Sequence, residues 1–270
     1  MSRLKDTDDF GARMKAYEAI ETARKLDPLL PVYARIDGRA FSTFTRGMEQ
    51  PFDRRLTTAM VETTKHLVHE THARIGYTQS DEINLVWFAE DEKSDIFFSG
   101  KVQKMVSVLA SMAAAKFATA ISLTWQERLP HFDARVFQLP NKIEAANIFL
   151  WRAMDARKNA ISMSAQAAFS HKQLHGKHGG EMLIMLRERG IEFDDYPEFF
   201  KNGTFVRRRT VMRDLTVEEM ARIPEQHRPT GPIQRSETVP VPCPDFLACT
   251  NREAFVFDGA DAECAARKTV

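Results

Sequence analysis

The stretch VYARIDG, residues 32–38, decides the fold that the sequence predicts. Its first part favours an extended strand over residues 32–36, and Asp37-Gly38 ends the run abruptly because glycine allows a sharp change of backbone direction. Apolar residues recur every three or four positions on both sides of this strand, over residues 8–26 and residues 53–73. A strand between two helices favours a mixed α and β fold.

Further elements follow in an order that identifies the architecture. The predicted elements are a helix over residues 8–26, a strand over 32–36, a helix over 53–73, strands over 73–77 and 83–89, a helix over 95–121 and a strand over 134–139. After the first helix, which is expected to lead into the core, the order is β-α-β-β-α-β. This is the split βαβ, ferredoxin-like unit, so we expect an α+β fold whose two helices cover one sheet face and leave the other for substrate or further chain.

The sequence pattern changes beyond Pro140, where helical patterns predominate. Residues 143–169 and 178–189 have helical patterns, and residues 204–211 favour a strand. Residues 222–244 are punctuated by prolines and predict an irregular segment. We therefore expect one unit over residues 1–140 and a mainly helical C-terminal part over residues 141–270.

Composition limits the class of protein. Of the 270 residues, 43% are apolar and 28% are charged, which is globular composition and excludes fibrous and disordered classes. The net charge of +1 gives no overall attraction to nucleic acid, so any polyanion site must be a local patch. No apolar run is long enough to span a membrane, and the N-terminus is acidic where a signal peptide is basic. We expect a soluble cytoplasmic protein with no membrane partner.

The cysteines give little indication of a site. Cys243, Cys249 and Cys264 are odd in number and lack the Cys-x2-Cys spacing of common zinc sites. Ordinary reduced thiols are therefore expected, with a metal or disulfide role as the less favoured alternative.

Two acidic positions are expected to meet in this topology. Asp37 ends the first strand and Asp81 lies in the predicted hairpin, whose second strand is the neighbour of the first. Two negative charges about 4 Å apart repel by roughly 4 kcal/mol at an effective dielectric near 20. A shared divalent cation offsets this, and Mg2+ favours one or two carboxylates together with waters and substrate phosphates. The alternative is that both acids are ordinary turn residues.

The local sequences around these acids resemble one family. The runs RIDGRAFSTF at 35–44, PFD at 51–53, GYTQSDE at 76–82 and FDARV at 132–136 are similar, in order and spacing, to the motifs of the tRNA-His guanylyltransferase family. The likeness continues through FLWR at 149–152, Asp155, Asn159, FSHK at 169–172 and LH at 174–175, which resemble the bacterial and archaeal guanylyltransferase-like branch. It covers about residues 10–210, with a fainter match at VPVP, residues 239–242.

The resemblance implies a polymerase-type palm, here residues 1–140, that extends RNA in the 3′-to-5′ direction. Residues 141–270 would complete the tRNA and nucleotide site. ATP activates the 5′-monophosphate of a tRNA, and the 3′-hydroxyl of an incoming nucleotide, GTP or another NTP, then displaces AMP with two Mg2+ ions present. Family members are generally tetramers, so a homotetramer is expected.

Site residues follow by position from the resemblance. Asp37 and Asp81 match the carboxylate metal ligands, the Gly38 carbonyl joins them, and Glu82 beside the second ligand is expected to be catalytic by orienting it. The remaining nucleotide-binding positions are Arg39, Ala40, Phe41, Asp53, Ser80, Lys104 and Arg135. Arg35 is also expected at the nucleotide, because strand alternation places it on the same sheet face as Asp37. Lys101 is expected there too, because it lies one helical turn before Lys104 and could face the same cleft. For Arg35, Arg39 and Lys101, a solvated or carboxylate-paired side chain is an equal alternative.

A tRNA partner requires basic surface, and the C-terminal part supplies it. The expected tRNA-binding residues are Arg152, Arg157, Lys158, Asn159, His171, Lys172, Lys177, Arg207 and Arg208. Such cations position an RNA backbone with little reading of bases. The alternative for each is a solvated helix face.

One departure from the family affects the expected substrate. Eukaryotic members carry a His-Ile-Asn-Asn run, associated with selecting tRNA-His, near residues 157–160, and this chain keeps one asparagine there, Asn159. The absence of the full His-Ile-Asn-Asn run favours template-dependent repair of 5′-truncated tRNA over strict tRNA-His guanylylation. Other readings are a palm-domain nucleotide cyclase, an ordinary primer-extending enzyme, and a tRNA-binding module without catalysis.

Overall fold

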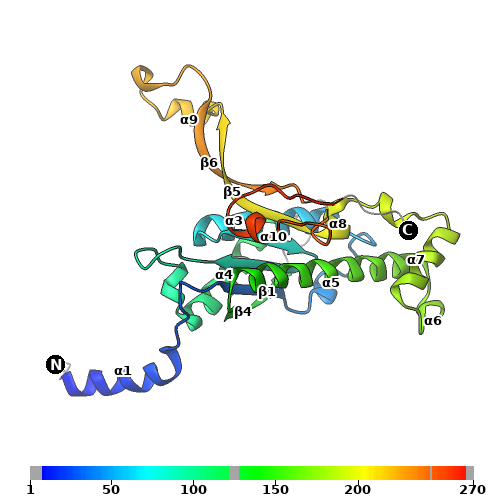
Figure 1. Ribbon diagram of the computed structural model, residues 1–270, viewed down its shortest axis with the longest axis horizontal. Coiled ribbons are helices and arrows are strands. Elements are labelled where there is room, and N and C mark those ends of the chain that lie inside the picture. The colour runs from blue at the N-terminus through cyan, green and yellow to red at the C-terminus, as the bar shows by residue number, and fades with distance from the viewer. Residues whose placement is uncertain (1–7, 122–127, 244, 266–270) are drawn as a thin grey trace.

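The computed structural model describes residues 8–121, 128–243 and 245–265 (Figure 1). Its centre is a six-stranded antiparallel sheet in the order β4-β1-β3-β2-β5-β6. The strands are β1 Val32–Gly38, β2 Ile75–Gln79, β3 Glu82–Trp87, β4 Phe132–Gln138, β5 Thr204–Arg213 and β6 Ile233–Val241. The predicted α+β class is confirmed, and β1 is the neighbour of β3 as the topology requires.

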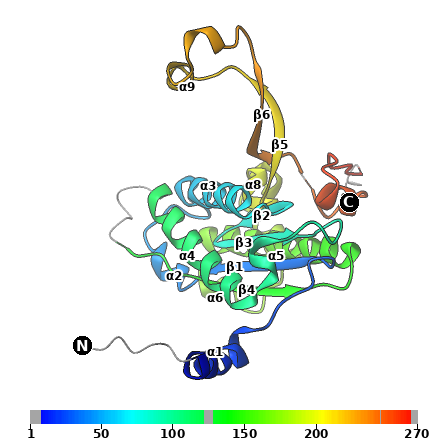
Figure 2. The same ribbon diagram turned by 90° about the vertical axis from the view of Figure 1, so that its left-hand side faces the viewer.

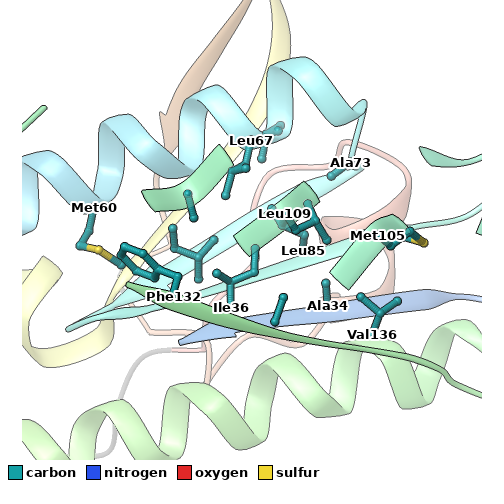
Figure 3. Packing of buried hydrophobic residues seen from close by; sticks show 14 of the residues in the cluster. Ala34, Ile36, Met60, Leu67, Ala73, Leu85, Met105, Leu109, Phe132 and Val136 are labelled. Carbon is teal, nitrogen blue, oxygen red and sulfur yellow. The ribbon is translucent and has the colours of Figure 1, made fainter. Parts of the chain in front are cut away.

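Two helices cover one face of the sheet. They are α3, Arg54–Thr71, and α4, Val102–Ala120, and they pack on alternate residues of β1 and β3, including Ala34, Ile36 and Leu85 (Figure 3). These side chains are fully buried. Each buried large aliphatic side chain contributes roughly 1.5–3 kcal/mol.

Further chain covers the other face. Helix α5, Lys142–Ala168, crosses it, and the C-terminal segment with α10, Arg252–Phe257, packs beside α5. Aromatic rings fill this second core, where Tyr33 of β1 meets Phe149 at 5.2 Å between ring centroids. The molecule therefore has three layers, with part of the second face left open near the end of β1.

Part of the segment predicted to be irregular, residues 233–241, forms strand β6 instead. Strand β6 pairs with β5 from Phe205↔Val241 to Arg213↔Ile233, and the hairpin extends away from the body, with α9, Val217–Ala221, near its tip (Figures 1 and 2). The prolines misled the prediction because Pro240 lies in the outermost strand of the sheet, where a missing N–H costs no ladder hydrogen bond.

Helix α1, Asp8–Thr22, forms where expected but does not enter the core. Phe10, Tyr17 and Ile20 are 55%, 60% and 75% exposed, and the helix stands away from the sheet (Figure 2). The periodicity predicts an apolar side of a helix without specifying what covers it. The expectation of core packing was therefore wrong within the single chain.

Short elements complete the chain. They are α2 Phe41–Phe44, η1 Phe97–Gly100, α6 His171–Leu174, α7 Gly179–Glu188, η3 Phe193–Asp195, α8 Glu198–Asn202 and η4 Glu225–His227. The helix predicted from residue 95 begins only at Val102, because Phe98, Ser99 and Gly100 have φ angles of 52°, 51° and 69° that interrupt a right-handed helix. Among the described helices, none combines the length and the apolar character that a membrane span requires.

The three cysteines are free thiols that gather in the C-terminal segment. Cys249 and Cys264 face each other across an isolated β-bridge, and burial raises the pKa of Cys243. They pack with the second core.

Candidate active site

Asp37 and Asp81 come to one end of the sheet from adjacent strands. Asp37 pairs with Glu82 in the β1–β3 register, and the Gly38 N–H donates to the Asp81 carbonyl oxygen at 3.0 Å. Ser80 and Asp81 form the tight turn between β2 and β3, in which Ser80 has a φ of 49°. Both acids therefore lie beside the end of β1, as the topology predicted.

The electrostatic environment of the two acids favours a cation. Burial first, and then the charge of Asp37, raise the pKa of Asp81 to about 6, against hydrogen bonds from the Asp81 main chain and the Ser80 side chain that lower it. Burial, followed by the charges of Glu82 and Asp133, also raises the pKa of Asp37. Both carboxylates are thus held where their negative charge is unfavourable unless a positive group offsets it.

The donor set fits magnesium better than a protein-enclosed ion. Within the described residues, no group of three or more His, Cys, Asp and Glu side chains could hold a metal ion. Two carboxylates and a backbone carbonyl are hard oxygen ligands that leave room for waters and phosphates, which is the coordination that Mg2+ prefers. Asp37, Asp81 and Gly38 can therefore hold magnesium if a polyphosphate completes the site.

Gly38 is required by the packing of Phe41. A Cβ at position 38 would lie 2.4 Å from Cδ2 of Phe41, a distance that real contacts do not reach. Phe41 is 4% exposed and packs against Phe44 and Phe117 at 4.9 Å and 5.4 Å between centroids. The ring expected at the nucleotide thus mainly anchors the turn after β1, whereas Ala40 and Arg39 are exposed.

A groove runs beside Asp81 and Ser80. Two adjoining depressions of about 320 Å³ and 60 Å³ share Phe52, Asp53, Leu56, Ser80 and Met163 as lining residues. The larger is also lined by Asp81, and the smaller by Asn159 and by Phe199 and Phe200 of α8. Apolar walls with a few polar groups are typical of small-molecule sites. The side chains from α8 were not predicted, because no motif in the sequence connects them with the acids.

Asp53 lines this groove but has a structural role. Its carboxylate caps α3 by accepting from the Arg55 N–H at 2.9 Å, and it accepts from the Glu49 N–H at 3.1 Å. The Arg55 guanidinium also donates to both oxygens, at 2.9 Å and 2.5 Å. These hydrogen bonds, that of the Arg55 side chain foremost, lower the pKa of Asp53 to about 2.

Replacing Asp53 by asparagine is expected to destabilise the protein by about 1 kcal/mol at pH 7, because asparagine still caps the helix but loses the charge facing the exposed Arg55. The folded pKa of about 2 lies below the unfolded value of 3.8, so the contribution is complete above the unfolded pKa and is lost as pH falls through the folded pKa. Urea unfolding of both proteins from pH 7 to pH 3 checks this. A difference that stays constant over that range contradicts it.

Glu82 and Arg152 form a buried ion pair that joins β3 to α5. Arg152 donates from Nε and Nη2 to the two Glu82 oxygens, both at 2.7 Å, and both side chains are 7% exposed. Asn84 donates to Glu82 at 2.8 Å. Arg152 is therefore no surface cation for tRNA, which corrects the prediction, and Glu82 is turned towards α5 as a fixed partner of Arg152.

Cations flank the acids on the open part of the second face. Arg35 lies 5.9 Å from the ring of Trp151, which is 52% exposed, and Arg135 is the register partner of Arg35 on β4. The charges of Arg35 and Arg135 both lower the pKa of Asp37, against the larger effect of burial. The expectation that Arg35 shares a face with Asp37 is confirmed.

Lys101 and Lys104 do not share a cleft with these acids in this chain. Both lysines are exposed at the start of α4, where Lys101 forms an isolated β-bridge with Lys25. The opposite end of α4 is the one near the acids. There the ring of Phe117 lies 5.6 Å, between centroids, from that of Phe132, which is the strand partner of Gly38. Phe117 follows Lys104 by thirteen positions along the helix, a rise of about 20 Å. Figure 3 shows this direction, with Met105 and Phe132 at opposite ends of the core. Helical spacing does not reveal which end of a helix faces the acids, and the nucleotide-binding assignment of Lys101 and Lys104 stays a prediction.

The other predicted tRNA contacts divide into exposed and enclosed residues. The exposed ones are Lys158, Asn159, His171, Lys172, Lys177 and Arg208. Arg207 is buried, donates to the carbonyl oxygens of Phe255 and Ala260, and stacks on the Phe255 ring at 4.4 Å, so it cannot contact RNA. Arg157 is half-buried, lies 5.2 Å from the ring of Phe193 and pairs at 3.9 Å with Asp194.

Comparison with known sequences identifies a family. The profile of the family described as tRNAHis guanylyltransferase (Thg1) matches residues 11–140. An uncharacterized protein of Acanthamoeba polyphaga mimivirus is 30% identical over 233 residues, which cover 77% of this chain and 80% of that protein. The tRNA(His) guanylyltransferase of Schizosaccharomyces pombe is 27% identical over 212 residues, covering 70% and 78%.

Solved structures agree with the sequence comparison. A bacterial Thg1-like protein in complex with ATP has a TM-score of 0.70 and 41% identity, covering 73% of this chain and 87% of its own. A bacterial Thg1-like protein in complex with GTP has a TM-score of 0.69 and 33% identity, covering 86% and 90%. With these levels of identity over most of both chains, the protein belongs to the tRNAHis guanylyltransferase (Thg1) family and is a nucleotidyltransferase of that family.

Proposed function

We propose that the protein adds nucleotides in the 3′-to-5′ direction to the 5′ end of tRNA through a polymerase-type palm. ATP activates the 5′-phosphate, and the 3′-hydroxyl of the incoming nucleotide then displaces AMP. The observation that carries the proposal is the meeting of Asp37 and Asp81 at the end of β1, beside a groove that Asp81 and Ser80 line.

Asp37, Asp81 and the Gly38 carbonyl would hold two magnesium ions. When bound, magnesium supplies stabilisation of the negative charge that develops on the attacking and leaving oxygens. Arg35 and Arg135 lie on the same sheet face as Asp37 and would balance the charge of a polyphosphate that reaches these acids. No protein nucleophile is required for this transfer.

The groove would hold the activating nucleotide. Its walls of Phe52, Phe199 and Phe200 suit the faces of a base, and Ser80 and Asn159 offer polar partners. ATP and GTP are the nucleotides named in complexes of the bacterial relatives. Because the groove adjoins Asp81, a nucleotide bound there places its phosphates towards the acids.

Template-dependent repair of 5′-truncated tRNA is the proposed use of this chemistry. Residues 157–160 lack the histidine and one asparagine associated with tRNA-His selection, and Asp155 pairs with Arg152 at 3.1 Å. Lys158, His171, Lys172, Lys177 and Arg208 remain as exposed groups for an RNA backbone. The alternative is guanylation specific for tRNA-His.

We also propose cytoplasmic tRNA as the substrate pool and a homotetramer as the working assembly. The exposed apolar side chains of α1 support a subunit interface, since such groups are usually covered.

One assay tests the proposed activity. Purified protein is incubated with ATP, Mg2+, labelled GTP and a tRNA that lacks its first nucleotide and carries a 5′-monophosphate. We expect label at the 5′ end opposite an unpaired 3′-side cytosine, and little label when that base is changed to one that cannot pair with guanine. Addition regardless of the opposing base favours tRNA-His-type guanylation. A cyclic nucleotide formed without tRNA, or binding without extension, contradicts the proposal.

A further inference from the structure

A further hollow lies beside the turn that follows Gly38. It is an open hollow of about 450 Å³, and its described lining includes Arg39, Arg46, Arg128 and His131, together with Thr43 and Phe44. None of the described residues that line it carries a carboxylate. We call it the basic pocket.

The basic pocket begins one residue after the proposed metal ligands. The Arg39 N–H donates to the His131 carbonyl oxygen at 2.8 Å, which joins the end of β1 to the segment that enters β4. The main chain of Gly38 is the register partner of Phe132 immediately beside it. The basic pocket therefore adjoins the turn that directly follows Asp37 and Gly38.

The walls of the basic pocket are held in place before any ligand arrives. The Arg128 guanidinium donates from Nη1 to the Phe44 and Arg46 carbonyl oxygens, at 2.6 Å and 3.1 Å. The buried rings of Phe41 and Phe44 anchor the same turn, stacking on each other at 4.9 Å. Such support lowers the ordering cost of binding.

The positive charge of the basic pocket favours an anion as its ligand. Within the described part of the chain, neither Arg39 nor Arg46 forms an ion pair with a carboxylate. Cations gathered around one cavity repel one another, and an anion offsets that repulsion. Guanidinium groups match phosphate oxygens in a planar, two-pronged geometry.

We propose that the basic pocket binds phosphate groups adjoining the reacting phosphate. They would come either from the tail of a nucleoside triphosphate or from the backbone of the tRNA acceptor strand. Only the choice between these two sources rests on the proposed function. Arg46, Arg128 and His131, which carried no motif in the sequence analysis, would be the residues that bind them.

Titration calorimetry with inorganic tripolyphosphate, without divalent metal, tests the basic pocket directly. Arg46→Gln is the chosen variant, because this exposed side chain donates no hydrogen bond to a described residue while its carbonyl still accepts from Arg128. We expect about tenfold weaker binding for Arg46→Gln and intermediate binding for Arg46→Lys. Arg222→Gln, at an exposed arginine after α9 on the distant hairpin, is the matched control and is expected to bind as the parent does.

Two further arms separate the sources of phosphate. A higher KM for the incoming nucleotide with unchanged RNA affinity assigns the basic pocket to the triphosphate tail. A weaker salt dependence of RNA binding, with its slope reduced by about one phosphate contact, assigns it to the RNA backbone. Circular dichroism of His131→Gln and Arg46→Gln establishes that both variants are folded.

Tripolyphosphate and RNA binding that match the parent in folded Arg46→Gln and His131→Gln would overturn the proposal. The calorimetric result does not depend on catalysis. If the parent adds no nucleotide to tRNA but Arg46→Gln still loses tripolyphosphate binding, the proposed function fails and the basic pocket remains a phosphate site.

Discussion

Replacing Asp37 or Asp81 by asparagine is expected to lower nucleotide addition by at least about a thousandfold, because each change removes a carboxylate that would hold magnesium at the reacting phosphates. The fold should survive. Both side chains are partly buried, and burial is the main cause of their raised pKa values. Removing a negative charge from such a position does not destabilise the folded state.

Single-turnover addition to a truncated tRNA measures this effect, with thermal unfolding and tRNA binding recorded for each variant. Asp214→Asn is the matched control, because Asp214 is an exposed aspartate at the end of β5, away from β1. It should retain the parental rate. An Asp37 or Asp81 variant that extends tRNA as fast as the parent would refute the metal assignment.

Replacing Arg152 by leucine is expected to destabilise the protein by about 3–5 kcal/mol, since the change leaves the buried Glu82 carboxylate without its partner. The pair is nearly inaccessible to water, and both Glu82 oxygens accept from Arg152. The combined variant Glu82→Gln with Arg152→Leu should recover much of that loss, because it removes both charges and leaves a side-chain amide for Asn84.

Urea unfolding of the single and combined variants gives the coupling energy. Arg222→Leu, at an exposed arginine, should change stability by less than about 0.5 kcal/mol. Equal losses in the single and combined variants would contradict a mutual ion pair. Recovered stability without recovered nucleotide addition would show that Glu82 also acts on the acids beside it.

The packing of α5 explains why motif matching alone misassigned several cations. The run FLWR at residues 149–152 is a single motif in the sequence, yet Trp151 is half exposed beside Arg35 while Arg152 is buried against Glu82. Adjacent residues on a helix point about 100° apart, so neighbours in one motif reach different environments. Arg207 and Arg208 divide in the same way on β5, because successive strand residues point to opposite faces.

The sequence by itself determined the strands and helices of the first part and their order, and hence the meeting of Asp37 and Asp81. Hydrophobic period and turn residues are local properties, and an antiparallel hairpin beside β1 leaves few ways to arrange the ends of the strands. Tertiary structure alone decided that α4 places Lys104 far from the acids, that α8 supplies a wall of the groove, and that Arg46, Arg128 and His131 line one pocket. Those outcomes depend on how elements far apart in the chain pack together. The local sequence of an element does not determine the direction in which it runs or the element against which it packs.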